Sequence, residues 1–186
     1  MLEAERNLAI RHHVRKFFAG HASEEHVWPL GPAQDELRRL RVMEFAPGPV
    51  IGLWVYVTVG AWEACDDPRI EFLIVTPEQD LRHNELLFMT AWYHRHHVLK
   101  CGDTFPIGES WLPGSRCEYF LVSLPYPFGP KLESCSFPDW HLHVRWLLPI
   151  TTGEREFKVR EGLEELEQRF ETCGLLYWVH TRESVV

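Results

Sequence analysis

Two groups of histidines come closest, by residue type and spacing, to a metal-binding or catalytic site. His141 and His143 alternate along an expected strand, so their side chains point to the same face and could chelate a transition metal with a third ligand. No third ligand can be identified from the spacing. With a distant cysteine, the pair would give a Cys/His or metal-dependent hydrolase. We favour the alternative, a pair of imidazoles on a half-exposed strand face.

The second group is His94, His96 and His97, near the end of an expected helix, with Cys101 behind them. Side chains at positions i, i+2 and i+3 do not place three metal ligands on one helical face. We therefore interpret this cluster as a polar helix end, whose imidazoles lie near the negative end of the helix dipole.

Motifs for nucleophilic catalysis and phosphate binding are absent from the sequence. It contains no Gly-x-Ser-x-Gly elbow, no Gly-x-Gly-x-x-Gly loop and no Walker loop. The glutamates from Glu154 to Glu171 have helical spacing and are interpreted as a solvated helix face. We expect no catalytic residue, no cofactor and no bound metal.

Composition and charge narrow the class of protein. An apolar content of 45% allows enough burial to offset chain entropy, so the chain should fold. The net charge of −8 disfavours nucleic acid and favours a basic partner. Five widely spaced cysteines without a Cys-x-x-Cys pair indicate a reducing compartment. No signal segment or membrane span of ~18 apolar residues is visible, so we expect a cytoplasmic protein that does not enter a membrane.

In the first half of the chain, the elements that must position these residues begin with an amphipathic helix over about residues 3–19, marked by Ile10, Val14 and Phe17. Strands are predicted at 41–45, 53–59 and 70–75 from their β-branched and aromatic content. A helix from about Glu78 to Val98 follows Pro77. Its expected apolar stripe, with one polar interruption, is traced by Leu81, Glu85, Leu86, Met89 and Tyr93.

The second half repeats strands followed by a helix. Strands are expected near 103–107, 117–124 and 141–148, and Leu163, Leu166 and Phe170 mark the buried face of the last helix. Strands grouped between helices favour an α/β fold of the α+β type, with a mixed, largely antiparallel sheet and packed helices. We expect a single domain over 1–186, in which 1–39 form an N-terminal helix and connector and 40–186 form the core.

The order of elements in residues 100–170 is the most specific feature of the sequence. The turn Cys101-Gly102-Asp103-Thr104 precedes the apolar run 119–124, a Pro-rich loop and the strand-like segment 141–150. The helix entry Thr151-Thr152-Gly153-Glu154 follows, with a Glu-rich segment behind it. This order resembles the suppressor of fused family, in which a second strand leads through a Pro or Gly into a Glu-rich double helix. The tail 182–186 and the strands at 54–60 and 69–72 are also similar, so the likeness covers most of 40–186.

The resemblance implies protein binding without catalysis. Animal members of the family hold a transcription factor of Hedgehog signalling through an added β-strand, whereas compact bacterial members resemble immunity proteins of toxin systems. The compact length and the tail favour the bacterial branch. We therefore expect an immunity-type inhibitor that binds and occludes a basic toxin domain. A scaffold that forms a homodimer through exposed aromatic residues is a further alternative.

The resemblance also implies a location for partner binding. The strand from Arg116 to Leu124 matches a family strand that helps form a peptide groove by backbone pairing, which makes Glu118, Tyr119 and Leu124 candidates. The segment behind it is Pro125-Tyr126-Pro127-Phe128 where animal members have acidic residues, so only the location carries over. Aromatic residues in or beside Pro- and Gly-rich segments add candidates: Trp111, Tyr126, Phe128 and Trp140. Closure of loops over the core is their alternative role.

Overall fold

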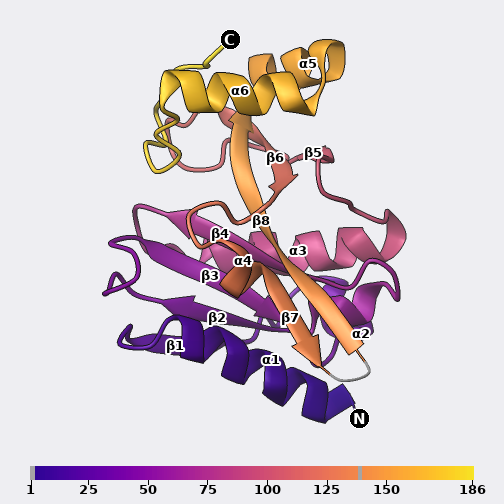
Figure 1. Ribbon diagram of the computed structural model, residues 1–186. Coiled ribbons are helices and arrows are strands. Elements are labelled where there is room, and N and C mark those ends of the chain that lie inside the picture. The colour runs from indigo at the N-terminus through magenta and orange to yellow at the C-terminus, as the bar shows by residue number, and fades with distance from the viewer. Residues whose placement is uncertain (1–2, 138–139) are drawn as a thin grey trace. The chain divides into compact units, whose positions relative to one another are not determined.

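The computed structural model describes residues 3–137 and 140–186 and shows a mixed α/β fold (Figure 1). Its strands are β1 (Ser23–His26), β2 (Arg41–Phe45), β3 (Trp54–Val59), β4 (Ile70–Thr76), β5 (Thr104–Pro106), β6 (Cys117–Ser123), β7 (Ser134–Phe137) and β8 (Trp140–Thr151). Its helices are α1 (Glu3–Phe17), α2 (Ala33–Glu36), the 3-10 helix η1 (Ala61–Ala64), α3 (Arg82–His96), α4 (Pro130–Glu133), α5 (Thr152–Glu161) and α6 (Leu163–Cys173). The predicted fold class is confirmed.

The chain is divided into two compact units. The larger unit contains residues 1–100 and 124–146, and the smaller unit contains 101–123 and 147–186. Strand β8 belongs to both, because its residues up to Trp146 lie in the larger unit and those from Leu147 lie in the smaller one. No helix in the described ranges is long and apolar enough to cross a membrane.

The larger unit is built on strands in the order β1-β2-β3-β4-β8, with β7 also paired to β8. All of these pairs are antiparallel except β4 with β8, where Ile70 lies opposite His143. Strands β3 and β4 are buried almost throughout, which explains why their runs of Val, Ile and Phe made them predictable. Helix α1 buries Ile10 and Val14 as predicted, whereas Phe17 stays half-exposed and Phe18 is buried instead.

Helix α3 corrects two predictions. It begins at Arg82 rather than near Glu78, because the Asp80 carboxylate accepts a hydrogen bond from the Arg82 backbone N–H at 2.9 Å and the chain before it forms a turn. The predicted apolar stripe is wrong, since Leu81 is 65% exposed and Met89 38% exposed. The buried face of α3 contains both polar and apolar side chains: His83, Asn84, Leu87, Phe88, Thr90, Ala91 and His94.

The smaller unit contains the strand order β8-β6-β5 and the helices α5 and α6. Leu166 and Phe170 form the buried face of α6, as predicted, and Leu163 is half-buried beside them. Gly162 separates α5 from α6 with φ +106° and ψ 169°, a conformation that is essentially confined to glycine. The predicted helical segment is thus two helices with a sharp break.

Candidate functional site

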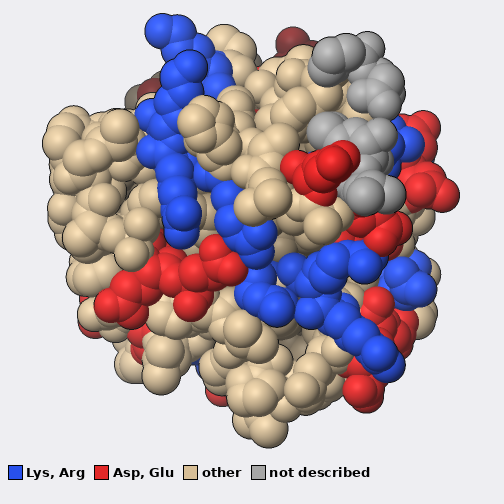
Figure 2. Space-filling view, turned by 90° about the horizontal axis from the view of Figure 1, so that it is seen from below, with Lys and Arg blue, Asp and Glu red and all other residues tan. Residues whose placement is uncertain are grey.

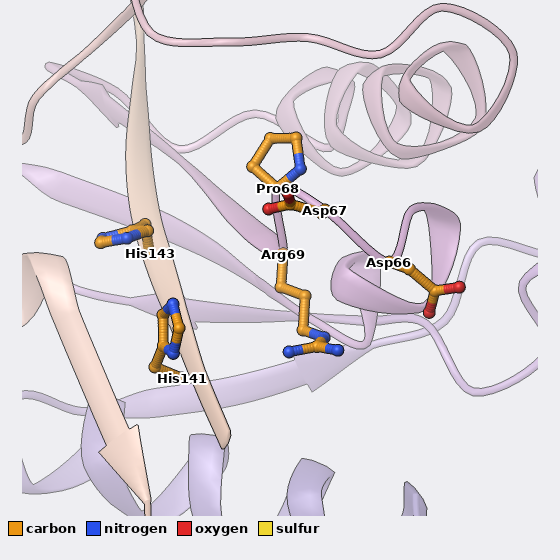
Figure 3. A pocket seen from close by; sticks show the side chains of 6 residues that line it. All are labelled: Asp66, Asp67, Pro68, Arg69, His141 and His143. Carbon is orange, nitrogen blue, oxygen red and sulfur yellow. The ribbon is translucent and has the colours of Figure 1, made fainter. Parts of the chain in front are cut away.

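A pocket in the larger unit contains the histidine pair that the sequence singled out (Figure 3). It has a volume of about 380 Å³, and its walls are formed by Asp66, Asp67, Pro68, Arg69, His141 and His143. The histidines come from β8, and the other four residues come from the segment between η1 and β4. The two segments meet where the His143 backbone N–H donates to the Arg69 carbonyl at 3.0 Å. This pairing fixes the pocket at the beginning of β4.

The geometry of the pair does not assemble a metal site. The two imidazole rings are 6.0 Å apart, centroid to centroid, at 75°. Within residues 3–137 and 140–186, no group of three His, Cys, Asp or Glu side chains could hold a metal ion. Burial lowers the pKa of His143, helped by the positive charge of Arg145, although Glu133 acts in the opposite direction. His143 therefore favours the neutral form.

The buried cysteines are poorly suited to act as nucleophiles. Burial raises the pKa of the Cys135 thiol to about 12 and raises that of Cys117 as well. Because the thiolate is the reactive form, both side chains behave as small apolar groups. The predicted alternative of a Cys/His hydrolase gains no support from these residues.

Glu71 in the larger unit is a fully buried carboxylate that sequence reasoning did not single out. It accepts hydrogen bonds from the Thr58 hydroxyl at 2.5 Å and from the backbone N–H groups of Gly60 and Ala61 at 2.8 and 3.1 Å. Burial raises its pKa to about 7, and these donors partly oppose the shift. The carboxylate satisfies the start of η1, so its role is structural.

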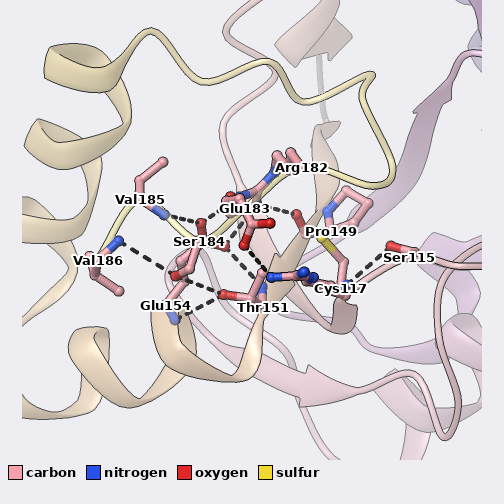
Figure 4. Close-up of polar contacts among 11 residues, drawn as sticks. Ser115, Cys117, Pro149, Thr151, Glu154, Arg182, Glu183, Ser184, Val185 and Val186 are labelled. Atoms are coloured by element: carbon pink, nitrogen blue, oxygen red, sulfur yellow. Dashed lines mark hydrogen bonds and ion pairs between the residues drawn. The ribbon is translucent and has the colours of Figure 1, made fainter.

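The smaller unit contains a second buried carboxylate, Glu154 (Figure 4). The prediction that Glu154 belongs to a solvated face is wrong, because the residue has no exposed surface. Its two oxygens accept from the Arg182 guanidinium at 2.5 and 2.7 Å, and Arg182 also donates to the Pro149 carbonyl at 3.1 Å. This bidentate pair joins the start of α5 to the C-terminal segment.

The same carboxylate completes the N-terminal cap of α5. Thr151 and Glu154 form a reciprocal capping box, with the Thr151 N–H donating to Glu154 at 2.9 Å and the Glu154 N–H donating to the Thr151 hydroxyl at 3.2 Å. The Val185 N–H donates to Glu154 at 3.2 Å, and the Thr151 hydroxyl contacts the Ser184 hydroxyl at 3.1 Å. The predicted helix entry is confirmed, and the tail is held against it.

The structure also corrects the interpretation of the histidines at the end of α3. His94 is fully buried and accepts a hydrogen bond from the Leu99 N–H at 2.9 Å, so it is not part of a polar helix end. His96 and His97 are exposed, as expected. Burial lowers the pKa of His94, which favours a neutral imidazole in the core.

Three predicted partner-binding aromatics fill the core. Trp111 is 1% exposed, Trp140 3% and Phe128 9%, so none of them presents an aromatic surface to a partner. Phe128 packs edge-on against Phe17 and Phe18, and the Trp140 ring packs against Trp62 with a centroid separation of 5.0 Å. Loop closure over the core, the alternative role, accounts for their positions.

The other predicted residues remain accessible to different degrees. Glu118 is exposed and accepts a hydrogen bond from the Thr152 hydroxyl at 3.0 Å, and Tyr119 is half-exposed beneath the Arg155 guanidinium. Tyr126 is 58% exposed, and Leu124 is half-buried. Glu118 and Tyr119 belong to the smaller unit, whereas Leu124 and Tyr126 belong to the larger one.

Backbone pairing along β6 is not available in the way the resemblance implied. Strand β6 is flanked by β8 and β5. Hydrogen bonds from Val122 N–H to Asp103 and from Ile107 N–H to Glu118, both 2.8 Å, show that alternate residues of the β5 segment face β6. The backbone polar groups of Thr104 and Pro106 therefore point away from β6, toward the outer edge, and Pro106 has no N–H to donate there. The edge of β5 is a poor template for an added strand.

Charge is distributed unevenly between the two units. The smaller unit has eleven acidic and six basic side chains, a formal charge of −5, and the larger unit has sixteen and thirteen, a charge of −3. Figure 2, which faces α1, shows bands of Lys and Arg lying between carboxylates. The acidic excess is therefore densest in the smaller unit, which also exposes Leu176 and Trp178. Sequence reasoning missed this apolar loop, which follows α6.

Comparisons with known proteins agree on one family. The model of the suppressor of fused protein (SUFU) family matches residues 36–183. The chain is 34% identical to a protein of Neisseria gonorrhoeae FA 1090 described as a SUFU homologue, with a TM-score of 0.88 over 98% of both chains. No curated protein matches.

Two more distant structures share the fold. One is the Sufu-Fu complex, at 16% identity and a TM-score of 0.66, with 97% of this chain and 92% of the other covered. The second is Drosophila Suppressor of Fused, at 15% identity and a TM-score of 0.57, with 78% of this chain and 42% of that one covered. With the family model matching most of its length, the chain belongs to the suppressor of fused protein family.

Proposed function

We propose that this chain is a non-enzymatic protein-binding domain of the immunity type, which binds a basic toxin domain and occludes it in the cytoplasm. The observation that carries the proposal is the surface of the smaller unit at the start of α5. There an exposed carboxylate, Glu118, lies beside the half-exposed Tyr119, in a unit of formal charge −5. The five cysteines, all of which lie in the described ranges, form no disulfide, which is compatible with a reducing compartment.

The mechanism would be steric. Acidic charge speeds the approach of a basic partner, and this effect weakens as salt screens it. Apolar and aromatic contacts then slow dissociation, a role that suits Tyr119 and the exposed Trp178. Because the outer edge of β5 contains Pro106, side-chain contacts rather than strand addition would form the interface in this unit.

The distant structural neighbour crystallised as a Sufu-Fu complex supports a protein partner by analogy of fold. The roles of two buried carboxylates of this chain also support a non-enzymatic function. Glu71 and Glu154 are the most deeply buried carboxylates described above, and both are committed to helix starts. Their oxygens accept hydrogen bonds that stabilise the fold.

The test is affinity capture from the source organism, with the wild-type chain and Glu118→Lys as baits. Asp35→Lys, an exposed position on α2 of the larger unit, makes the same charge change as a control. We expect one basic protein to be recovered by the wild type and by Asp35→Lys and lost with Glu118→Lys. Expression of that protein alone should arrest growth, and co-expression of this chain should relieve the arrest. A folded bait that captures nothing, or equal capture by both variants, would contradict the proposal.

A further inference from the structure

Figure 3 shows charged side chains of both signs around one small pocket of the larger unit. Arg69 supplies a guanidinium, and Asp66 and Asp67 supply two exposed carboxylates. Within the described ranges, Arg69 forms no ion pair with either aspartate, although they are only three and two residues away in the sequence. The walls of the pocket thus contain charges of both signs that form no ion pair with one another.

The Arg69 guanidinium is nevertheless held in place. It lies 5.9 Å from the centroid of the Trp140 ring, a buried side chain that also has the Arg6 guanidinium at 5.1 Å. Stacking of this kind engages the face of a guanidinium and leaves its N–H edge available. A fork of N–H donors of this geometry matches a carboxylate, which can accept two hydrogen bonds from it.

The remaining walls suit the rest of a small ligand. His141 and His143 present imidazoles from β8, which add hydrogen-bonding atoms and ring surface, and burial lowers the pKa of His143 so that it favours its neutral form. The Pro68 ring adds an apolar surface. The volume of about 380 Å³ lies within the range of small-ligand sites and exceeds what one ion fills.

From this arrangement we propose that the pocket is a binding site for a free α-amino acid. The ligand carboxylate pairs with Arg69, and its ammonium group pairs with Asp67. An anion alone would contact only the guanidinium, and a cation alone would contact only a carboxylate. A ligand with one charge of each sign satisfies both. The pocket residues belong to the larger unit and Glu118 belongs to the smaller one, and the proposal does not depend on the proposed protein partner.

The experiment is a thermal-shift screen of the twenty free L-amino acids at about 10 mM, followed by calorimetry of those that raise the melting temperature. We expect at least one to bind. Its N-acetyl form lacks the ammonium and its amide form lacks the carboxylate, and each should bind about tenfold more weakly or worse, because one charge-assisted contact is lost. A ligand whose two derivatives bind as well as the parent would overturn the assignment of charges.

Substitutions of the charged pocket residues test whether the amino acid binds in this pocket. Arg69→Gln and Asp67→Asn should each weaken binding about tenfold or more. Arg38→Gln, at an exposed arginine of the same unit, should leave the affinity unchanged. Circular dichroism shows whether each variant is folded. If no amino acid binds the wild type, or if Arg69→Gln binds as tightly as Arg38→Gln, the proposal is refuted.

Discussion

Removing the Arg182 guanidinium should destabilise the smaller unit strongly. In Arg182→Met the long side chain still fills the space, but the Glu154 carboxylate loses both of its charged hydrogen bonds. The Arg182 side chain is only 7% exposed and that of Glu154 is 0% exposed, so water cannot replace the lost contacts. Stranding a buried charge in this way costs about 3–5 kcal/mol in the free energy of unfolding.

Urea unfolding followed by tryptophan fluorescence measures this change, and hydrogen exchange of the α5 and α6 amides locates it. Arg116→Met is the matched control, because Arg116 forms an ion pair with Glu183 in which the side chains are 63% and 73% exposed. That variant should change stability by less than about 1 kcal/mol.

A second variant separates charge from packing. Adding Glu154→Gln to Arg182→Met removes the stranded charge while keeping an acceptor for the Thr151 N–H. The double variant should therefore be more stable than Arg182→Met alone, by about 1 kcal/mol or more. If Arg182→Met costs less than about 1 kcal/mol, or if the double variant is the less stable of the two, the buried-pair reasoning is wrong.

Three further changes test other parts of the fold by urea unfolding. Gly162→Ala should lower the free energy of unfolding by about 1–3 kcal/mol, because Gly162 has a φ of +106°. Gly52→Ala should be nearly neutral, because Gly52 has no positive φ and an added Cβ there would meet no neighbouring atom. Equal effects of the two substitutions would contradict this reasoning. Burial lowers the pKa of His83 to about 4. The contribution of neutral His83 to the free energy of unfolding is therefore complete above the unfolded pKa of 6.5 and falls by roughly 3 kcal/mol as the pH drops to 4. His83→Phe should flatten this dependence of stability on pH. The raised pKa of Glu71, about 7, acts with the opposite sign: its stabilisation is complete below pH 4.5 and is lost as the pH rises through 7, and Glu71→Gln should abolish this trend.

The sequence was most informative where side-chain pattern and burial agree. Strands β3 and β4 are buried on both faces, and their continuous apolar runs were recognised within a residue of their ends. The start of α5 was recognised because the Thr151 cap acts through local hydrogen bonds. Strand β1, in contrast, consists of Ser23-Glu24-Glu25-His26 and owes its conformation to pairing with β2, which no local pattern reveals.

Candidate site residues were harder to predict, because residue type does not report burial. Trp111 and Trp140 were selected as aromatic residues near loops, yet both are core side chains. Glu154 was assigned to a solvated face, because its partner Arg182 is distant in sequence. The pocket could be anticipated only in part: the alternation of His141 and His143 was correct, but Arg69 joins them through the parallel pairing of β4 with β8.

The division of β8 between the two units has a consequence for synthesis on the ribosome. Residues 1–100 and 124–146 belong to the larger unit, and residues 101–123 and 147–186 belong to the smaller unit. Strand β4 therefore emerges long before its parallel partner β8, and Ile70 stays unpaired on that side until His143 has been made. The larger unit can complete its sheet only after the first segment of the smaller unit has been translated, and pairings of this sequence separation form slowly. A ribosome stalled before residue 140 would thus hold a larger unit with an open edge at β4, a target for chaperones or for aggregation.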